Sequence, residues 1–358
     1  MEILLNLFTA LLLTMTLLPL SRSNVWWVRV FDFPRFQLLI AAIILATLEL
    51  ALTDLKSSKG LTGLLITLAC LIYQFVWIYP YTRLARKEVA WAEPSGKGET
   101  LTLVCANVLT PNKEAKKLIT LLEKCSPDVI LTLESNDWWQ QQLSTIENQY
   151  TYSIKIPLDN LYGMHLYSKF PIQDAEISFL LKEDIPSIHC KILLPSGNLV
   201  RCHFLHPAPP VPEYSNSSGE RDAELIAVAK SVSNETMPVI VAGDLNDVAW
   251  STTTRLFRKT SRLLDPRVGR GLINTFHADY WFLRWPLDHL FHSHHFTVKK
   301  LHRLPKFGSD HFALFTELVL EPNSRNRNDS ALTKSQADDL EVKNILDKQP
   351  VEAADVPR

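Results

Sequence analysis

The pair Asp244 and Asn246 combines residue types and a spacing that suit chemistry. Both lie in the segment PVIVAGDLNDVAW (residues 238–250), where the apolar run 239–242 is bounded by a proline and a glycine. Such a run predicts a buried strand with its polar residues at the carboxyl end. Side chains two residues apart point the same way on an extended chain, so this carboxylate and amide can reach one reacting group. Taken alone, Gly-Asp-x-Asn is also typical of a tight turn.

Other polar side chains with chemical potential also fall at the ends of predicted strands. They are Asn107, Glu134, His206, Asp288, Asp310 and His311. Each stands among apolar neighbours, and burying a polar group without a partner costs free energy. One such residue would be explained as a turn or a satisfied polar group. The whole set is better explained as one site.

The region from about residue 100 to residue 320 must position these side chains. Its hydrophobic patterns predict strands at 101–108, 128–134, 164–170, 187–195, 198–206, 239–242, 287–292, 296–304 and 312–320, and helices at 113–124, 221–232 and 252–259. The strands neither alternate strictly with helices nor form an all-β run. This order favours an α/β sandwich over a doubly wound sheet.

Three apolar segments precede this region, at about residues 2–20, 36–52 and 61–80. Each is about long enough to cross a bilayer core, and aromatic residues lie at the ends of the segments, so we expect three transmembrane helices. A signal peptide is the alternative for the first, although no Lys or Arg precedes it and no small-residue cleavage pattern follows.

Four parts are therefore expected along the chain. They are a membrane domain (1–87), a linker rich in Gly, Pro and Ser (88–99), a domain carrying the polar set (100–320) and a tail (321–358). The tail has no aromatic residue and mixes charges with Asn and Ser, so we expect it to be disordered.

Flanking charges predict the orientation of an integral protein in a bacterial-type inner membrane. The first loop carries Arg22, Arg29 and Arg35, and three further basic residues follow the third segment, against two in the second loop. Basic loops stay in the cytoplasm, which favours a cytoplasmic position for the large domain. Five cysteines without a metal spacing agree with a reducing compartment. Cys190 and Cys202 facing each other across a hairpin would leave the periplasmic alternative open.

The order Asn107, Glu134, Tyr162-Gly163, Ser168, His206, Gly243-Asp-Leu-Asn246, Leu287-Asp288 and Gly308-Ser-Asp-His311 resembles the endonuclease/exonuclease/phosphatase superfamily. That group includes deoxyribonucleases, abasic-site endonucleases, neutral sphingomyelinases and inositol-polyphosphate phosphatases. The resemblance covers about residues 99–320 and leaves the apolar segments outside. It implies a four-layer α/β sandwich, with two mixed β-sheets face to face and helices outside, and metal-dependent hydrolysis of phosphoester bonds.

The resemblance also implies a metal site. Glu134 is the first-choice ligand for Mg²⁺, with Mn²⁺ as an alternative ion, because a hard cation takes oxygen ligands and needs only one or two carboxylates. Asn107 and Asp310 would complete or orient its shell. In phosphoryl transfer, a protein mainly positions the reacting groups and stabilises their charge. The bound ion would contribute to both.

The remaining residues take catalytic roles under the same resemblance. Asp244 would orient or deprotonate the attacking water, and Asn246 would donate to a phosphoryl oxygen. His311, oriented by Asp288, matches the histidine–aspartate pair beside the phosphate, where a carboxylate partner favours the cationic ring. His206 would act as the acid for the leaving group.

The family's default activity is that of a nuclease, and the rival hypothesis is a phosphoesterase acting on lipid headgroups or small molecules. The loops near Asn107 and Asn160 and the loop 207–218 carry few basic residues, which disfavours a DNA-binding face. A membrane anchor instead suits a bilayer partner. A non-catalytic membrane scaffold is a further alternative, and no protein partner is inferable. The apolar segment YWFLRWP (280–286) is expected to be buried, or else to form an exposed rim at an interface.

Overall fold

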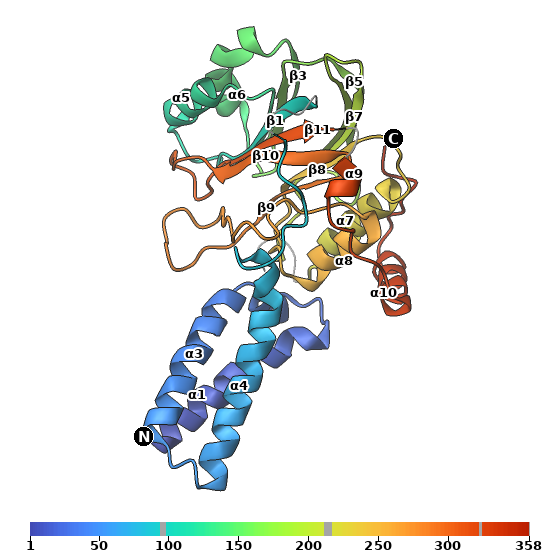
Figure 1. The fold of residues 1–358 in the computed structure, drawn as a ribbon. Helices are drawn as coiled ribbons and strands as arrows, with labels where there is room; N and C mark the ends of the chain where they lie inside the picture. Colours follow the sequence, from blue (N-terminus) through green and yellow to red (C-terminus); the bar gives the residue numbers. More distant parts are fainter. Residues whose placement is uncertain (94–97, 211–216, 322–323, 358) are drawn as a thin grey trace.

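The computed structural model describes residues 1–93, 98–210, 217–321 and 324–357. A helical bundle projects from one end of a larger domain built on two β-sheets, here called the sheet domain (Figure 1). The bundle consists of α1 (Glu2–Leu17), α3 (Arg35–Leu52) and α4 (Ser58–Ile78), with the short α2 (Trp26–Arg29) in the first loop. Three segments, Glu2–Ser21, Arg35–Leu52 and Ser58–Tyr81, are long and apolar enough to cross a membrane, as the sequence predicts.

The first sheet has the strand order β10-β11-β1-β2-β4-β3 and the second β5-β6-β7-β8-β9. The first consists of β1 (Glu99–Asn107), β2 (Val129–Leu133), β3 (Tyr152–Ile156), β4 (Met164–Ser168), β10 (Phe296–Arg303) and β11 (Leu314–Leu320). The second consists of β5 (Ile172–Ser178), β6 (Ser187–Leu193), β7 (Leu199–Leu205), β8 (Val239–Asp244) and β9 (Asp288–His292). Both sheets are mixed, because β1 pairs with β2 and β7 with β8 in parallel whereas the other pairs are antiparallel.

Alternation along β1 divides the core into layers. Leu103 and Cys105 belong to the apolar cluster between the two sheets, whereas Val104 and Ala106 pack toward the outer helices. These helices are α5 (Ala115–Cys125) and α6 (Asp137–Leu143) on the first sheet and α7 (Gly219–Val232) and α8 (Thr252–Ser261) on the second. The expected four-layer α/β sandwich is therefore confirmed.

Two strands, β3 and β5, are absent from the sequence-based prediction. Each lies at an edge of its sheet. Most residues of β5 are exposed, and β3 has no fully buried residue. Edge strands of this kind lack the apolar run by which a buried strand is recognised.

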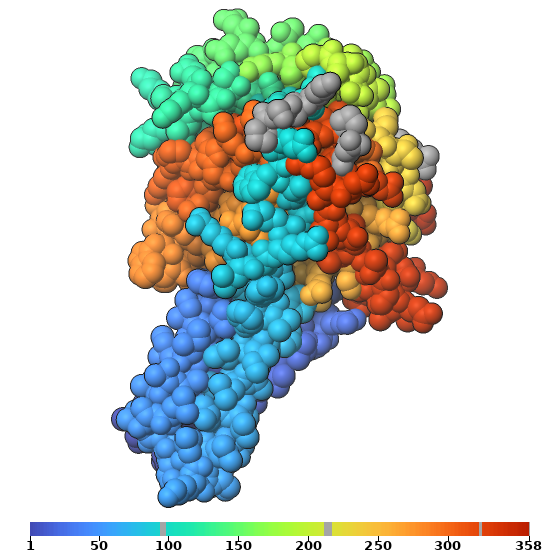
Figure 2. All heavy atoms as spheres, viewed as in Figure 1, coloured from blue at the N-terminus to red at the C-terminus, as the bar shows by residue number. Residues whose placement is uncertain are grey.

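The prediction of a disordered tail disagrees with the structure. Ser335 and Asp338 form a capping box at the start of α10 (Gln336–Leu346), and Lys259 of α8 pairs with Asp338 at 2.7 Å. Val342 is buried against α7 and α8, and the chain beyond α10 also packs on the sheet domain (Figure 2). A few well-placed valines and a good cap compensate for the polar composition.

The predicted linker is also partly built into the fold. The buried carboxylate of Glu88 accepts two hydrogen bonds of 2.6 Å from Arg258 of α8, and Val89 belongs to the core between the sheets. Residues 94–97 of this segment lie outside the described part of the chain. The bundle is consequently joined to the sheet domain by packed residues as well as by chain connectivity.

Candidate active site

Asn107 and Glu134 meet where β1 and β2 end side by side. The Nδ2 group of Asn107 donates to Glu134 Oε1 at 2.7 Å and to Asp244 Oδ2 at 3.2 Å. The parallel pairing of β1 with β2 makes this meeting possible, because the carboxyl ends of parallel strands lie at the same edge. Asp244 comes from the other sheet, so Asn107 links the two sheets at the site.

Asp244 ends β8 directly opposite Asp288, the first residue of β9. The glycine before Asp244 allows this geometry: Gly243 has φ +147°, and a Cβ atom there would lie 1.9 Å from the carbonyl oxygen of Leu205 on β7. A larger residue at position 243 would push β8 away from β7. The Gly-Asp-x-Asn motif is thus the end of a strand that continues into a turn.

His311 lies between these two carboxylates. Its Nδ1 is 2.8 Å from Asp288 Oδ2 and its Nε2 is 3.5 Å from Asp244 Oδ2. Burial lowers the pKa of His311, but Asp288 and Asp244 outweigh that effect and raise the pKa to about 10. The ring is therefore an imidazolium at neutral pH.

The facing rings act on Asp244 in turn. Burial favours the protonated carboxyl, yet His311 and His206 together bring the pKa of Asp244 below its ordinary value. For His206, burial lowers the pKa to about 4, against the attraction of Asp244. His206 lies 5.3 Å from the ring of Tyr162 and is neutral at pH 7.

Glu134 offers the best candidate ligand atom for a cation. Its Oε2 is buried and has no hydrogen-bond partner among the described residues, and its φ of +59° is rare for a residue with a side chain. Burial raises the pKa of Glu134 to about 7, against the hydrogen bond from Asn107. A buried carboxylate oxygen without a donor fits a hard divalent ion. Asp310 lies near enough to repel this carboxylate, and its own main-chain oxygen accepts from Ala278 at 2.6 Å.

A second group of possible ligands lies beside Glu134, because Asn107 contacts both Glu134 and Asp244. Asp244, Asp288 and His311 offer ligand atoms that lie within 4.8 Å of one another. The His311 imidazolium already supplies a positive charge at this point, and a cationic ring cannot bind a metal. The free oxygen of Glu134 is therefore the better candidate ligand.

Asn246 is held by its backbone and by its amide. Its N–H donates to Asp244 Oδ1 at 3.0 Å, and its Nδ2 donates to the carbonyl of Pro207 at 2.9 Å. The Nη1 group of Arg221 donates to the Asn246 carbonyl at 2.6 Å. Among the described residues, no second acceptor is found for this amide, which leaves one of its hydrogens available to a substrate oxygen.

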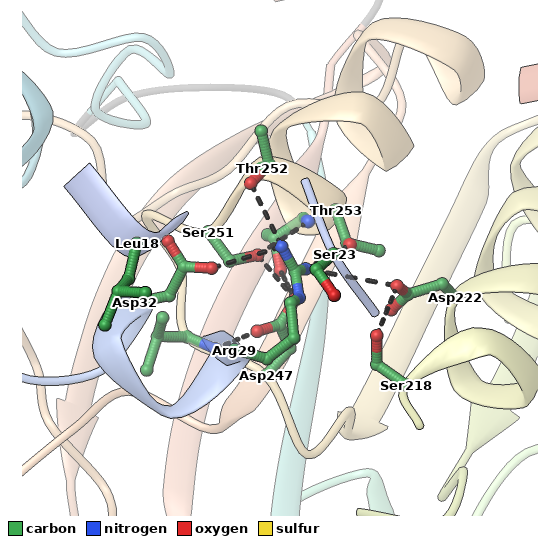
Figure 3. A network of polar contacts seen from close by, with 12 residues as sticks. Leu18, Ser23, Arg29, Asp32, Ser218, Asp222, Asp247, Ser251, Thr252 and Thr253 are labelled. Atoms are coloured by element: carbon green, nitrogen blue, oxygen red, sulfur yellow. Dashed lines mark hydrogen bonds and ion pairs between the residues drawn. The ribbon is translucent and has the colours of Figure 1, made fainter. Parts of the chain in front are cut away.

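Arg221 is the main residue that the sequence analysis missed. Besides Asn246, its guanidinium contacts Asp222 at 2.8 Å and Asp247 at 3.6 Å. Asp222 and Asp247 also lie beside Arg29 of the first membrane-proximal loop, as Figure 3 shows. An arginine near the start of a predicted helix gives no local sign of such distant contacts.

A charge measurement tests this geometry. We expect His311 to stay protonated at pH 8, and Asp288→Asn to lower its pKa by at least about one unit because the substitution removes an adjacent negative charge. NMR of the full-length protein with ¹⁵N-labelled histidine rings reports both states. A His311 ring that titrates near its ordinary value in the unsubstituted protein would contradict the arrangement.

Comparisons with known proteins give the family of the chain. Residues 104–311 match the Endonuclease/Exonuclease/phosphatase family, which is more than half of the chain's 358 residues. No curated protein matches the chain.

Similar solved structures include an endonuclease/exonuclease/phosphatase from Beutenbergia cavernae (17% identity, 62% of this chain, 72% of that chain, TM-score 0.51). They also include the human Nocturnin catalytic domain with a bound sulfate anion (16% identity, 63% of this chain, 94% of that chain, TM-score 0.51). A third is D. rerio TDP2 complexed with single strand DNA product (15% identity, 62% of this chain, 99% of that chain, TM-score 0.50). At these identities the structures show a shared fold. Together with the match over residues 104–311, they establish that the chain belongs to the endonuclease/exonuclease/phosphatase family.

Proposed function

We propose that this protein is a membrane-anchored, divalent-metal-dependent phosphodiesterase. The observation that carries the proposal is the buried imidazolium of His311 between Asp288 and Asp244, with the unpartnered oxygen of Glu134 close by. A site of this kind presents positive charge to a phosphoryl group while it holds a carboxylate ready for a water molecule. The family relationship supports hydrolysis of phosphoester bonds in general.

Glu134 is the proposed Mg²⁺ ligand, with Mn²⁺ as the alternative ion. Asn107 orients it through the 2.7 Å hydrogen bond, and Asp310 adds negative charge nearby. When bound, such an ion neutralises phosphoryl charge and polarises the bond that breaks.

The protein's own groups account for the remaining steps. Asp244, kept ionised by the His311 cation and by hydrogen bonds from Asn246 and Asn107, orients the attacking water and accepts its proton. His311 and the free amide hydrogen of Asn246 donate to non-bridging phosphoryl oxygens. His206 is neutral at pH 7, so we assign it a hydrogen bond to the substrate in place of the acid role that the resemblance implies.

Glu134→Gln tests the metal site. We expect a loss of at least about 100-fold in turnover at millimolar Mg²⁺, because the substitution keeps the shape of the side chain and removes its charge. In the unsubstituted enzyme, protons compete with the ion for a carboxylate whose pKa is about 7. Lowering the pH from 8 to 6 should therefore raise the Mg²⁺ concentration for half-maximal activity by about tenfold.

The measurements are Mg²⁺ titrations with a generic diester at both pH values, and circular dichroism shows whether the variant is folded. Glu147→Gln is a matched control, because that glutamate is partly exposed and pairs with Lys155 outside the site. Near-parental turnover in Glu134→Gln would remove Glu134 from the metal site, and activity in excess EDTA would remove the metal from the mechanism.

The surface beside the site favours a lipid substrate within this chemistry. The loop side chains Tyr280, Trp281 and Phe282 are 51%, 80% and 53% exposed, so the expectation that this segment is buried is wrong for these three residues. Gln37, at the start of α3, donates through Nε2 to the carbonyl of Phe282 at 2.9 Å. The aromatic residues therefore lie level with the end of a membrane-spanning helix, where such side chains insert among headgroups.

The same loop also reaches the site. Phe276 packs against His311, with 4.9 Å between ring centroids, and His277 packs against Tyr280 at 4.7 Å. A substrate among the lipid headgroups on the side of the bilayer that faces the sheet domain would thus lie near the reacting groups. Nuclease activity remains the family's default, and single strand DNA is the product named for the similar D. rerio structure.

The paired substitution Trp281→Ala and Phe282→Ala separates the two substrates. We expect hydrolysis of phospholipid headgroups in vesicles to fall by about tenfold, because the loop no longer inserts, while a soluble diester is cleaved at an unchanged rate. Phe179→Ala is the control, since Phe179 is 46% exposed beyond the end of β5. Efficient nicking of plasmid DNA in Mg²⁺ at physiological salt, with vesicles untouched, would reject the lipid substrate.

We further propose that the sheet domain faces the cytoplasm of a bacterial-type cell. Three spans place the first loop and the chain after the third span on the same side of the membrane. The contact of the first loop with the sheet domain through Arg29 agrees with this topology. A reporter that is active only after export, fused to the C-terminus, should be silent, whereas one active only in the cytoplasm should work. The opposite pattern would place the site in the periplasm. Cys190 and Cys202, which face each other across β6 and β7 and are free thiols in this structure, would then be exposed to oxidising conditions.

A further inference from the structure

A cavity of about 370 Å³ lies where the membrane bundle meets the sheet domain. Its wall combines the end of the first span (Pro19, Leu20), the end of the third (Tyr73, Trp77) and the start of α8 (Thr252, Thr253). In Figure 1 this junction lies directly above the bundle. The cavity therefore sits at the depth of the lipid headgroups, apart from the candidate active site.

The cavity carries a surplus of positive charge. Its lining includes five cationic side chains and three carboxylates; these are Arg22, Arg29, Arg35, Arg255 and Lys259, and Asp222, Asp338 and Glu341. Lys259 is neutralised by Asp338 at 2.7 Å, whereas Arg22 reaches Glu341 only at 3.5 Å. Arg255 is exposed and forms no ion pair with the described residues. Its guanidinium lies 5.3 Å from the centre of the Trp77 ring, at the apolar edge of the cavity.

Two buried arginines each have one donor group without an acceptor among the described residues. Arg29 and Arg35 have side chains only 6% and 2% exposed, and the Nε group of each has no hydrogen-bond partner among the described residues. Both contact Asp32, at 3.2 Å and 2.6 Å, and Arg29 also lies 4.0 Å from Asp222. The start of α8 lies on the same wall, and the first backbone N–H groups of a helix favour an anion, although that of Thr254 already donates to the Ser251 side chain.

The part of the wall that the first and third spans contribute is largely apolar. Leu20 is 52% exposed at the end of the first span, and Trp77 lies one turn before the end of the third. Arg35 stacks over Trp77 at 4.6 Å from the ring centre, which fixes the indole beside the cationic group. A ligand with a charged head and an apolar tail fits such a wall better than a free anion does.

We propose that this cavity binds the phosphate headgroup of an anionic phospholipid, with the acyl chains along the first and third spans. Arg255 takes the phosphate at the mouth of the cavity, and the donors of Arg29, Arg35 and the α8 start lie behind it. The proposal concerns an accessory binding site and does not depend on the reaction at the active site. Asp222 on the cavity wall also contacts Arg221, so the cavity and the Asn246 turn share one buried polar network.

Arg255→Gln tests the proposal, because an exposed arginine can be replaced without loss of folding. We expect phosphatidylglycerol added to the delipidated full-length protein to raise its melting temperature, and phosphatidylcholine to have a smaller effect. The variant should bind phosphatidylglycerol at least about fivefold more weakly, since each basic group near an anionic headgroup contributes about 1 kcal/mol. Native mass spectrometry measures the bound lipid.

Arg83→Gln is the matched control, because Arg83 is exposed just after the third span and does not line the cavity. It should bind as the unsubstituted protein does. An equal loss in both variants would mean attraction to general surface charge and would overturn the proposal. Displacement of the lipid by millimolar inorganic phosphate would also overturn it, because the site would then be one for a soluble anion.

Discussion

The candidate site depends on a protonated imidazole held between two buried carboxylates. A buried cation is tolerated only when a partner offsets the loss of hydration. Asp288 and Asp244 supply that partner from neighbouring strand ends in one sheet, whereas His311 comes from the segment before β11 in the other. The charges therefore meet only when both sheets are packed face to face. The Oε2 atom of Glu134, which has no partner among the described residues, lies beside this charged group.

The membrane bundle is part of this folded structure. Tyr81 at the end of the third span donates to the Ala249 carbonyl, and Trp250 donates to the Asp32 carbonyl in the first loop. Both contacts follow closely on the Asn246 turn. The position of the helical bundle on the sheet domain is consequently fixed by buried hydrogen bonds, and the aromatic loop is held against the start of α3 by Gln37. This arrangement argues for a substrate that is met at the bilayer surface.

Sequence reasoning succeeded where the physical signal was local. Apolar runs predicted the candidate spans and the central strands, and the polar residues that end those strands lie together in the structure, because a strand end leaves its last side chain at a defined place. Edge strands such as β5 gave no apolar run. The Arg221 contact with Asn246 joins residues on different elements, and no local pattern predicts it. Composition suggested disorder for the tail, where the capping box at Ser335 was the informative signal. Exposure of Trp281 depends on tertiary position, so hydrophobicity alone favoured the wrong answer.

A double-mutant cycle measures the central claim most directly. Turnover of a soluble diester by the full-length enzyme is compared for Asp244→Asn, His311→Ala and the double variant at saturating Mg²⁺. If both residues act on one transition state, each single change costs about 100-fold or more and the double change costs far less than the product. Multiplicative losses, or near-parental activity in either single variant, would contradict the account.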